Sequence, residues 1–223
     1  MGFQYSQEVL DNVEKELGVV GLFARFEDVR KWGRIRGLDG AAFQIQYQRF
    51  LQELVEVHEA YTFDSYVELQ DAIGDTFVTL VNLAKTFGER AEDCVCMMEI
   101  DTLSDRPEEF HQQYQYILRD AVDIHNQWNL DNMADVQSAI GAVIIGLLEM
   151  AEDFTQGGMI CMNQAFGEIE FRKGLNIGGD FIRYAKLTDD EKDLCDDVQG
   201  SPGKDHYDGS LVLDFSHFDK SSL

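Results

Sequence analysis

A segment of this chain occurs twice, and that duplication limits the folds open to it. Residues 51–84 align without a gap on residues 118–151, with ten of the 34 positions identical. The longest shared run is Ala-Ile-Gly, at 72–74 and at 139–141. Apolar residues recur at helical spacing in both copies, so each copy is predicted to form a pair of helices. Two such pairs can bury their apolar faces against each other, which predicts a four-helix bundle with a pseudo-twofold axis.

Helical spacing of apolar residues extends beyond the duplicated segment. The predicted helices cover residues 8–24, 27–35, 43–60, 65–87, 110–127, 132–153 and 157–172. From residue 174 the sequence is glycine-rich and typical of loops, and it ends in what we expect to be an extended tail. The expected fold is therefore all-α. Its predicted parts are one helical domain at 1–190, with repeat one at about 43–90 and repeat two at about 110–172, and a C-terminal extension at 191–223.

The net charge of the chain indicates which classes of binding partner are unfavourable. The chain carries 18 basic and 42 acidic residues, a net charge of −24, which disfavours nucleic acid or an anionic membrane as a partner. No uninterrupted apolar run reaches about 18 residues, and the first residues lack the basic-then-apolar order of a secretory signal. We expect a cytoplasmic protein without a membrane span. The four cysteines lack the spacing and the histidine partners of a structural zinc site and are expected to be reduced thiols.

A narrow line of acids runs along the two predicted helices of the first copy. Glu53 and Glu56 are three residues apart on the first helix, so they share a helix face. Asp71 and Asp75 are four apart on the second helix, and an antiparallel hairpin brings the two faces opposite each other. Converging carboxylates repel one another unless cations lie between them. An all-oxygen ligand set favours Mg²⁺ or Mn²⁺, so these acids predict a metal site.

The second copy has lost part of this line. At the position of Asp75 it has Ala142, and the surrounding helix has the composition of a fully buried element. A solvated face would have no reason to lose its acids in one copy alone, so the contrast favours a functional site in the first copy. Glu68 and Asn82 lie on the same stripe and are further candidates for metal ligands or for side chains that support them.

Basic residues gather after the second copy. Arg172, Lys173, Arg183 and Lys186 surround three glycines. Glycine permits close approach of the backbone, and Arg or Lys side chains can hold a phosphate. Beside a carboxylate–metal site, this segment predicts the phosphate-binding half of a pocket for a nucleotide polyphosphate. The string GGDF at 178–181 is interpreted as coincidental, because that signature belongs to an α/β domain.

Other candidate residues are assigned to packing. His58 recurs as His125 in the second copy, which favours a shared packing or hydrogen-bonding role over general-base catalysis. Trp32 is interpreted as a core residue of an amphipathic helix rather than as a platform for a base. The sequence suggests no Ser/His/Asp or Cys/His set for covalent catalysis.

Several of these segments, in this order, resemble the MazG-like all-α nucleoside triphosphate pyrophosphohydrolases. The segments are VRKWGRIRGL, LQELVEV, LQDAIGDTFVTLVNLAKTFG and AFGEIEFRKGLNIGGDFIRY, within about residues 27–90 and 157–190. The duplication is similar to that of the dimeric dUTPase branch of the same superfamily. The resemblance implies hydrolysis of an NTP or dNTP to the monophosphate and pyrophosphate, with two or more Mg²⁺ or Mn²⁺ ions in the site.

The resemblance also assigns roles to residues. Glu53 and Glu56 match the family's first metal pair and Asp75 matches its final aspartate, so these three are the expected catalytic residues. Glu53 is the expected residue to orient the attacking water. An alanine stands where the family has its third acid, and either Asp71 or Glu68 must substitute for it.

The expected function is thus a Mg²⁺-dependent nucleotide pyrophosphohydrolase. The base and sugar preference stays open, with dGTP or another deoxynucleotide as candidate substrates. One alternative is a non-catalytic acidic helical protein that binds a basic partner, and another is a regulator that binds nucleotides without turnover. A homo-oligomer is also compatible with the sequence, because the duplication can replace a dimer or two chains can pair further.

Overall fold

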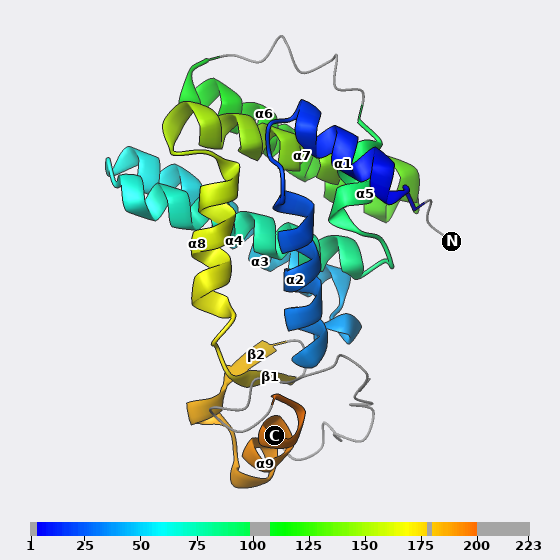
Figure 1. The fold of residues 1–223 in the computed structure, drawn as a ribbon, viewed down its shortest axis with the longest axis vertical. Helices are drawn as coiled ribbons and strands as arrows, with labels where there is room; N and C mark the ends of the chain where they lie inside the picture. The colour runs from blue at the N-terminus through cyan, green and yellow to red at the C-terminus, as the bar shows by residue number, and fades with distance from the viewer. Residues whose placement is uncertain (1–3, 99–107, 178–179, 200–223) are drawn as a thin grey trace.

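The computed structural model describes residues 4–98, 108–177 and 180–199, and it confirms the all-α fold (Figure 1). The helices are α1 (Gln7–Glu16), α2 (Leu22–Ile35), α3 (Phe43–Thr62), α4 (Tyr66–Lys85), α5 (Ala91–Cys96), α6 (Phe110–Asn129), α7 (Met133–Phe154), α8 (Gly158–Ile169) and α9 (Asp189–Gln199). Two short strands, β1 (Gly174–Ile177) and β2 (Asp180–Arg183), and the 3₁₀ turns η1 (Leu38–Gly40) and η3 (Tyr184–Lys186) complete the list. Most of the predicted tail, residues 200–223, lies outside the described residues.

The duplication appears in three dimensions as a pair of reciprocal hydrogen bonds. The hydroxyl of Tyr47 on α3 donates to the carbonyl oxygen of Ala121 at 2.9 Å. The equivalent residue of the second copy, Tyr114 on α6, donates to the carbonyl oxygen of Leu54 at 3.0 Å, and Leu54 is the equivalent of Ala121. Each bond is therefore the pseudo-symmetric image of the other. The helices α3, α4, α6 and α7 form the predicted core of two related pairs, with α3 packed on α4 and α6 on α7.

The copies extend one helix further than the repeat in the sequence indicates. A Cβ atom built at Gly74 would lie 2.2 Å from the backbone oxygen of Cys161, and one built at the equivalent Gly141 would lie 2.2 Å from that of Cys94. A residue larger than glycine therefore cannot stand at either position without a backbone shift. These contacts pack α8 on α4 and α5 on α7, so the third helix of each copy crosses to the second helix of the other. The helix α5 was not predicted from the sequence.

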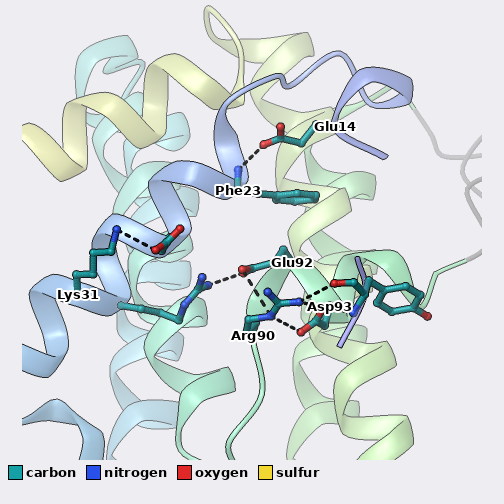
Figure 2. A network of polar contacts seen from close by, with 9 residues as sticks. Glu14, Phe23, Lys31, Arg90, Glu92 and Asp93 are labelled. Atoms are coloured by element: carbon teal, nitrogen blue, oxygen red, sulfur yellow. Dashed lines mark hydrogen bonds and ion pairs between the residues drawn. The ribbon is translucent and has the colours of Figure 1, made fainter. Parts of the chain in front are cut away.

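The N-terminal segment forms two helices, as predicted, but the break between them falls at residues 17–21 rather than at 25–26. Gly18 (φ +71°) and Gly21 (φ +94°) take left-handed conformations that turn the chain between α1 and α2. The carboxylate of Glu14 then caps α2, because it accepts a hydrogen bond from the backbone N–H of Phe23 at 2.5 Å (Figure 2). Apolar spacing continues across this turn, which is why the sequence pattern did not reveal the break.

Two buried acids on α5 are neutralised by arginines. Arg30 on α2 donates to Glu92 at 2.5 Å, and Arg90 donates to Asp93 through two nitrogen atoms, each at 2.6 Å (Figure 2). Glu92 and Asp93 are each 2% exposed. Removal of Arg90 would leave the buried charge of Asp93 without its arginine partner, whereas Glu92 also has Arg90 at 3.9 Å. This network fastens α5 to α2 and accounts for these acids as structural residues.

The segment expected to be loop-rich is folded. Strand β1 pairs antiparallel with β2, and α9 packs on β1. Leu175, Leu187 and Cys195 form a small second core between them. The hairpin and α9 lie at one end of the molecule, beyond the neighbouring ends of α2 and α8 (Figure 1). The predicted boundary between residues 190 and 191 falls inside α9, so the folded part of the described chain continues past it.

Among the described helices, α7 has the length and apolar composition that a membrane span would need. Its most apolar window has a mean hydropathy of 1.5 and is 61% buried inside the protein. Ile140, Ile144 and Leu147 of this helix are fully buried. This burial is typical of the central helix of a helical core.

Candidate functional site

A cleft of about 120 Å³ lies where α2, α3, α4 and the end of α8 meet the β-hairpin. Its polar lining consists of Gln46, Arg49, Glu53, Asp75, Thr79, Asn82 and Arg172. Four of these residues belong to the set predicted from the sequence to bind metal or phosphate or to support such a site: Glu53, Asp75, Asn82 and Arg172. The structure thus brings predicted residues of both kinds to one cavity.

Helix periodicity explains how α3 and α4 supply these side chains. On α3, Gln46, Arg49 and Glu53 recur at spacings of three and four residues, so they share one face. On α4, Asp75 and Asn82 are two turns apart. The turn between the helices is tight, with Asp64 in a left-handed conformation (φ +54°), and it sets the helices side by side as an antiparallel pair.

The carboxylates of the cleft have strongly shifted acidities. Burial raises the pKa of Glu53 to about 7, and the charges of Glu56 and Asp71 act in the same direction. Burial likewise raises the pKa of Asp75 to about 7, with further contributions from Asp71 and Glu53. The charges of neighbouring carboxylates thus contribute to the raised pKa of both Glu53 and Asp75, which a set of independent surface acids would not show.

Asp71, rather than Glu68, joins this group. Burial raises the pKa of Asp71, and the charge of Asp71 in turn raises the pKa of both Glu53 and Asp75. Its Oδ1 atom is buried without a hydrogen-bond partner among the described residues. Glu68 is exposed in the first turn of α4 and is not among the charges that shift these pKa values.

Arg172 is the cation that acts on all three shifted carboxyls, since its charge lowers the pKa of Glu53, Asp71 and Asp75. Its guanidinium Nη2 donates to Glu168 on α8 at 3.0 Å, and both side chains are partly exposed. Sequence reasoning missed Glu168. Its position four residues before Arg172 on one helix was the available signal.

The other three predicted phosphate ligands lie elsewhere. Lys173 makes an ion pair with Asp196 on α9, and its ammonium group lies 4.6 Å from the ring centroid of Tyr184. Arg183 on β2 and Lys186 in η3 are exposed, and neither lines the cleft. Of the four predicted residues, Arg172 alone lines this cavity.

An aromatic wall closes one side of the cleft. Trp32, interpreted from the sequence as a core residue, packs on the core and also lines the cavity. Its indole N–H donates to the carbonyl oxygen of Ile169 at 2.7 Å. The ring of Phe181 on β2 lies beside it, with 5.7 Å between the centroids. The hairpin therefore contributes directly to the site, which the prediction of a loop did not anticipate.

Arg36 fixes this wall to the end of α8. Its side chain is buried and donates through Nε and Nη2 to the carbonyl oxygen of Arg172, at 2.9 and 2.6 Å. The guanidinium also lies 4.6 Å from the ring centroid of Trp32. Burial lowers the pKa of Arg36 to about 10, which still leaves it charged at neutral pH. Arg36 thus sets the relative positions of Trp32 and Arg172.

The donor set suits a hard cation, but the side chains surround the cleft rather than converge. Within residues 4–98, 108–177 and 180–199, no three His, Cys, Asp or Glu side chains stand close enough together to hold a metal ion. Glu53 and Asp75 offer carboxylate oxygens from facing helices, and the buried Asp71 Oδ1 has no hydrogen-bond partner in the described part of the chain. Carboxylates that repel one another would turn inward only around a cation.

No protein-family model matches the chain, and comparisons with curated proteins and with solved structures give no match either.

Proposed function

We propose that this protein is a Mg²⁺-dependent nucleotide pyrophosphohydrolase, which cleaves an NTP or dNTP to the monophosphate and pyrophosphate. The observation that carries the proposal is that Glu53, Asp75 and Arg172 line one cleft. The charge of the neighbouring Asp71 raises the pKa of both cleft carboxyls. The resemblance of the motifs to MazG-like enzymes supports the same function. Copy two lacks this grouping, since its equivalents of Asp71 and Asp75 are Ser138 and Ala142.

The protein's own groups account for binding and orientation in this proposal. Arg172 exchanges its surface contact with Glu168, which is worth little in water, for the phosphates of the substrate. Glu53 accepts a hydrogen bond from the attacking water and directs it toward the α-phosphorus. Glu53, Glu56, Asp71 and Asp75 would hold Mg²⁺, which when bound lowers the pKa of its water and neutralises the triphosphate.

The proposal is tested by the release of pyrophosphate. The protein is incubated with Mg²⁺ and each canonical ribo- and deoxyribonucleoside triphosphate, and pyrophosphate and monophosphate are quantified. We expect stoichiometric formation of both products from at least one nucleotide, and loss of activity in Asp75→Ala. Absence of pyrophosphate with every nucleotide, together with wild-type behaviour of Asp75→Ala, would rule the proposal out.

The same samples separate the two alternatives. Binding of a triphosphate in calorimetry without product would identify a nucleotide-binding regulator. Salt-sensitive association with a cationic protein, without any rise in melting temperature on addition of Mg²⁺, would identify an acidic interaction protein.

A further inference from the structure

We infer that Gln46 and Asn82 form the end of the cleft that recognises a nucleobase, and that their carboxamides read its hydrogen-bonding edge. This inference rests on the proposed function and specifies the substrate contact of the same site. Two buried polar atoms of the cleft lack a hydrogen-bond partner in the part of the chain that the structure describes.

Both carboxamides are buried and incompletely hydrogen-bonded. Gln46 is 2% exposed and Asn82 is 7% exposed, and both line the cleft. Gln46 Nε2 and Asn82 Oδ1 have no hydrogen-bond partner among the described residues. A buried donor or acceptor without a partner costs about 1–3 kcal/mol, so two at one site point to a ligand that supplies the partners.

In the second copy, the equivalent glutamine has a protein partner for its side-chain donor. Gln113, the equivalent of Gln46, donates through Nε2 to Asp153 at 2.5 Å. In the first copy the position of Asp153 is held by Thr86, whose hydroxyl donates to the carbonyl oxygen of Leu83 at 2.8 Å. Among the described residues, a partner for the glutamine Nε2 is therefore present in the second copy and missing in the first, whereas the Oε1 of Gln113 is also without a hydrogen-bond partner.

The position of the pair matches the length of a nucleoside. Gln46 precedes Glu53 by seven residues on α3, and Asn82 follows Asp75 by seven residues on α4. Because these helices are antiparallel, both carboxamides lie at the same end, about 10 Å along the helix axes from the carboxylates. A substrate with its phosphates beside Arg172 would extend its base toward Gln46 and Asn82.

The chemistry of the surrounding wall suits a planar heterocycle. Trp32 and Phe181 offer aromatic surface, and any of the nucleobases can stack on such a surface. A neutral carboxamide offers both a donor and an acceptor, and a half-turn about its terminal torsion exchanges them. Stacking would therefore provide affinity, while Gln46 and Asn82 would provide the discrimination between bases.

The test uses near-isosteric variants that turn each carboxamide into an acceptor-only group. The variants Gln46→Glu and Asn82→Asp are compared with wild type, with melting curves recorded to show that each is folded. The matched control is Gln113→Glu, which alters the same residue type in the second copy away from the cleft. Values of kcat/KM are measured for all canonical nucleoside triphosphates with Mg²⁺. Binding of the four deoxynucleoside monophosphates is measured by calorimetry in EDTA.

We expect at least one cleft variant to change the ratio of kcat/KM between the preferred nucleotide and the next by about tenfold or more. Gln113→Glu should leave the ratio unchanged. Ratios within twofold of wild type in both cleft variants, or a wild type that does not discriminate between bases, would overturn the inference. If wild type releases no pyrophosphate, the proposed function fails. The calorimetry still decides the inference, because loss of monophosphate preference in the cleft variants upholds it and an unchanged preference overturns it.

Discussion

Asp75 on α4 and Glu53 on α3 line one cleft, where burial and then the charges of Asp71 and Glu53 raise the pKa of Asp75 to about 7. The buried acids of α5 show the opposite arrangement, because Arg30 and Arg90 pair with them directly. The fold thus neutralises its structural acids and leaves the cleft acids in mutual repulsion. We interpret this difference as the mark of a cation site.

Replacement of Asp75 should raise the stability of the metal-free protein and lower its activity. Asp75→Asn removes a buried carboxyl whose ionisation is unfavourable in the metal-free protein, so we expect a higher melting temperature in EDTA at pH 8. The same change should lower kcat at least about 100-fold, because a group that binds or orients the reacting components is lost. Paired melting and pyrophosphate assays check both effects, and a variant that loses stability in EDTA would contradict the electrostatic account.

The pH dependence of stability follows from the same two carboxyls. An unfolded chain ionises Glu53 and Asp75 near the ordinary values of 4.5 and 3.8, whereas the folded metal-free protein retains both protons up to about pH 7. Between these limits the folded state binds more protons, so the free energy of unfolding contributed by these groups falls as pH rises and levels off above about 7.

We therefore compare wild type with the double variant Glu53→Gln/Asp75→Asn in EDTA. The melting temperature of the double variant minus that of wild type should grow as the pH rises from about 5 to about 8. A difference that does not depend on pH would show that these carboxyls titrate normally in the folded protein.

Divalent cations should stabilise the wild-type protein. A ligand that binds only the folded state at a concentration of 100 times Kd adds about 2.7 kcal/mol of stability, which corresponds to a rise of several degrees for a chain of this size. We expect this rise with Mg²⁺ or Mn²⁺ in differential scanning calorimetry. Potassium chloride of equal ionic strength and the variant Asp75→Asn are the controls, and an equal rise in all samples would indicate general screening.

The crossing of the third helices can be tested at two glycines. Gly74→Ala and Gly141→Ala each place a Cβ atom 2.2 Å from a backbone oxygen, so each should cost about 1–3 kcal/mol of stability. Gly167→Ala on α8 is the matched control, because a Cβ there meets nothing within 4 Å, and alanine is the better helix former. The free energy of unfolding of each variant is measured by chemical denaturation. A lower value for Gly167→Ala than for the other two variants would contradict this packing.

Much of the fold was predictable because it repeats. The offset between the copies predicted which helices form a pair, and the acids lost in copy two indicated which pair carries the candidate site. Periodicity could not reveal the turn at Gly18 and Gly21, since apolar residues keep helical spacing across it. The helix α5 spans only Ala91–Cys96, too few residues for a periodic signal.

The missed parts of the site depend on contacts between distant segments. Lys173 has the sequence context of a phosphate ligand, but Asp196 on α9 holds it outside the cleft. Phe181 enters the cleft because β2 pairs with β1, in a hairpin too short to show strand alternation. Gln46 lay on the same helix stripe as Glu53 and was overlooked because a lone amide carries no charge pattern.

The most direct test of the central claim compares two equivalent acids, Glu56 on α3 and Asp123 on α6. Both side chains are acidic and occupy the same position in their copies, but the charge of Glu56 raises the pKa of Glu53 in the cleft. Pyrophosphate release with Mg²⁺ is measured for Glu56→Gln and Asp123→Asn on the nucleotide that wild type prefers. The account predicts a loss of at least about tenfold in Glu56→Gln and wild-type activity in Asp123→Asn. Equal activity of the two variants would contradict it.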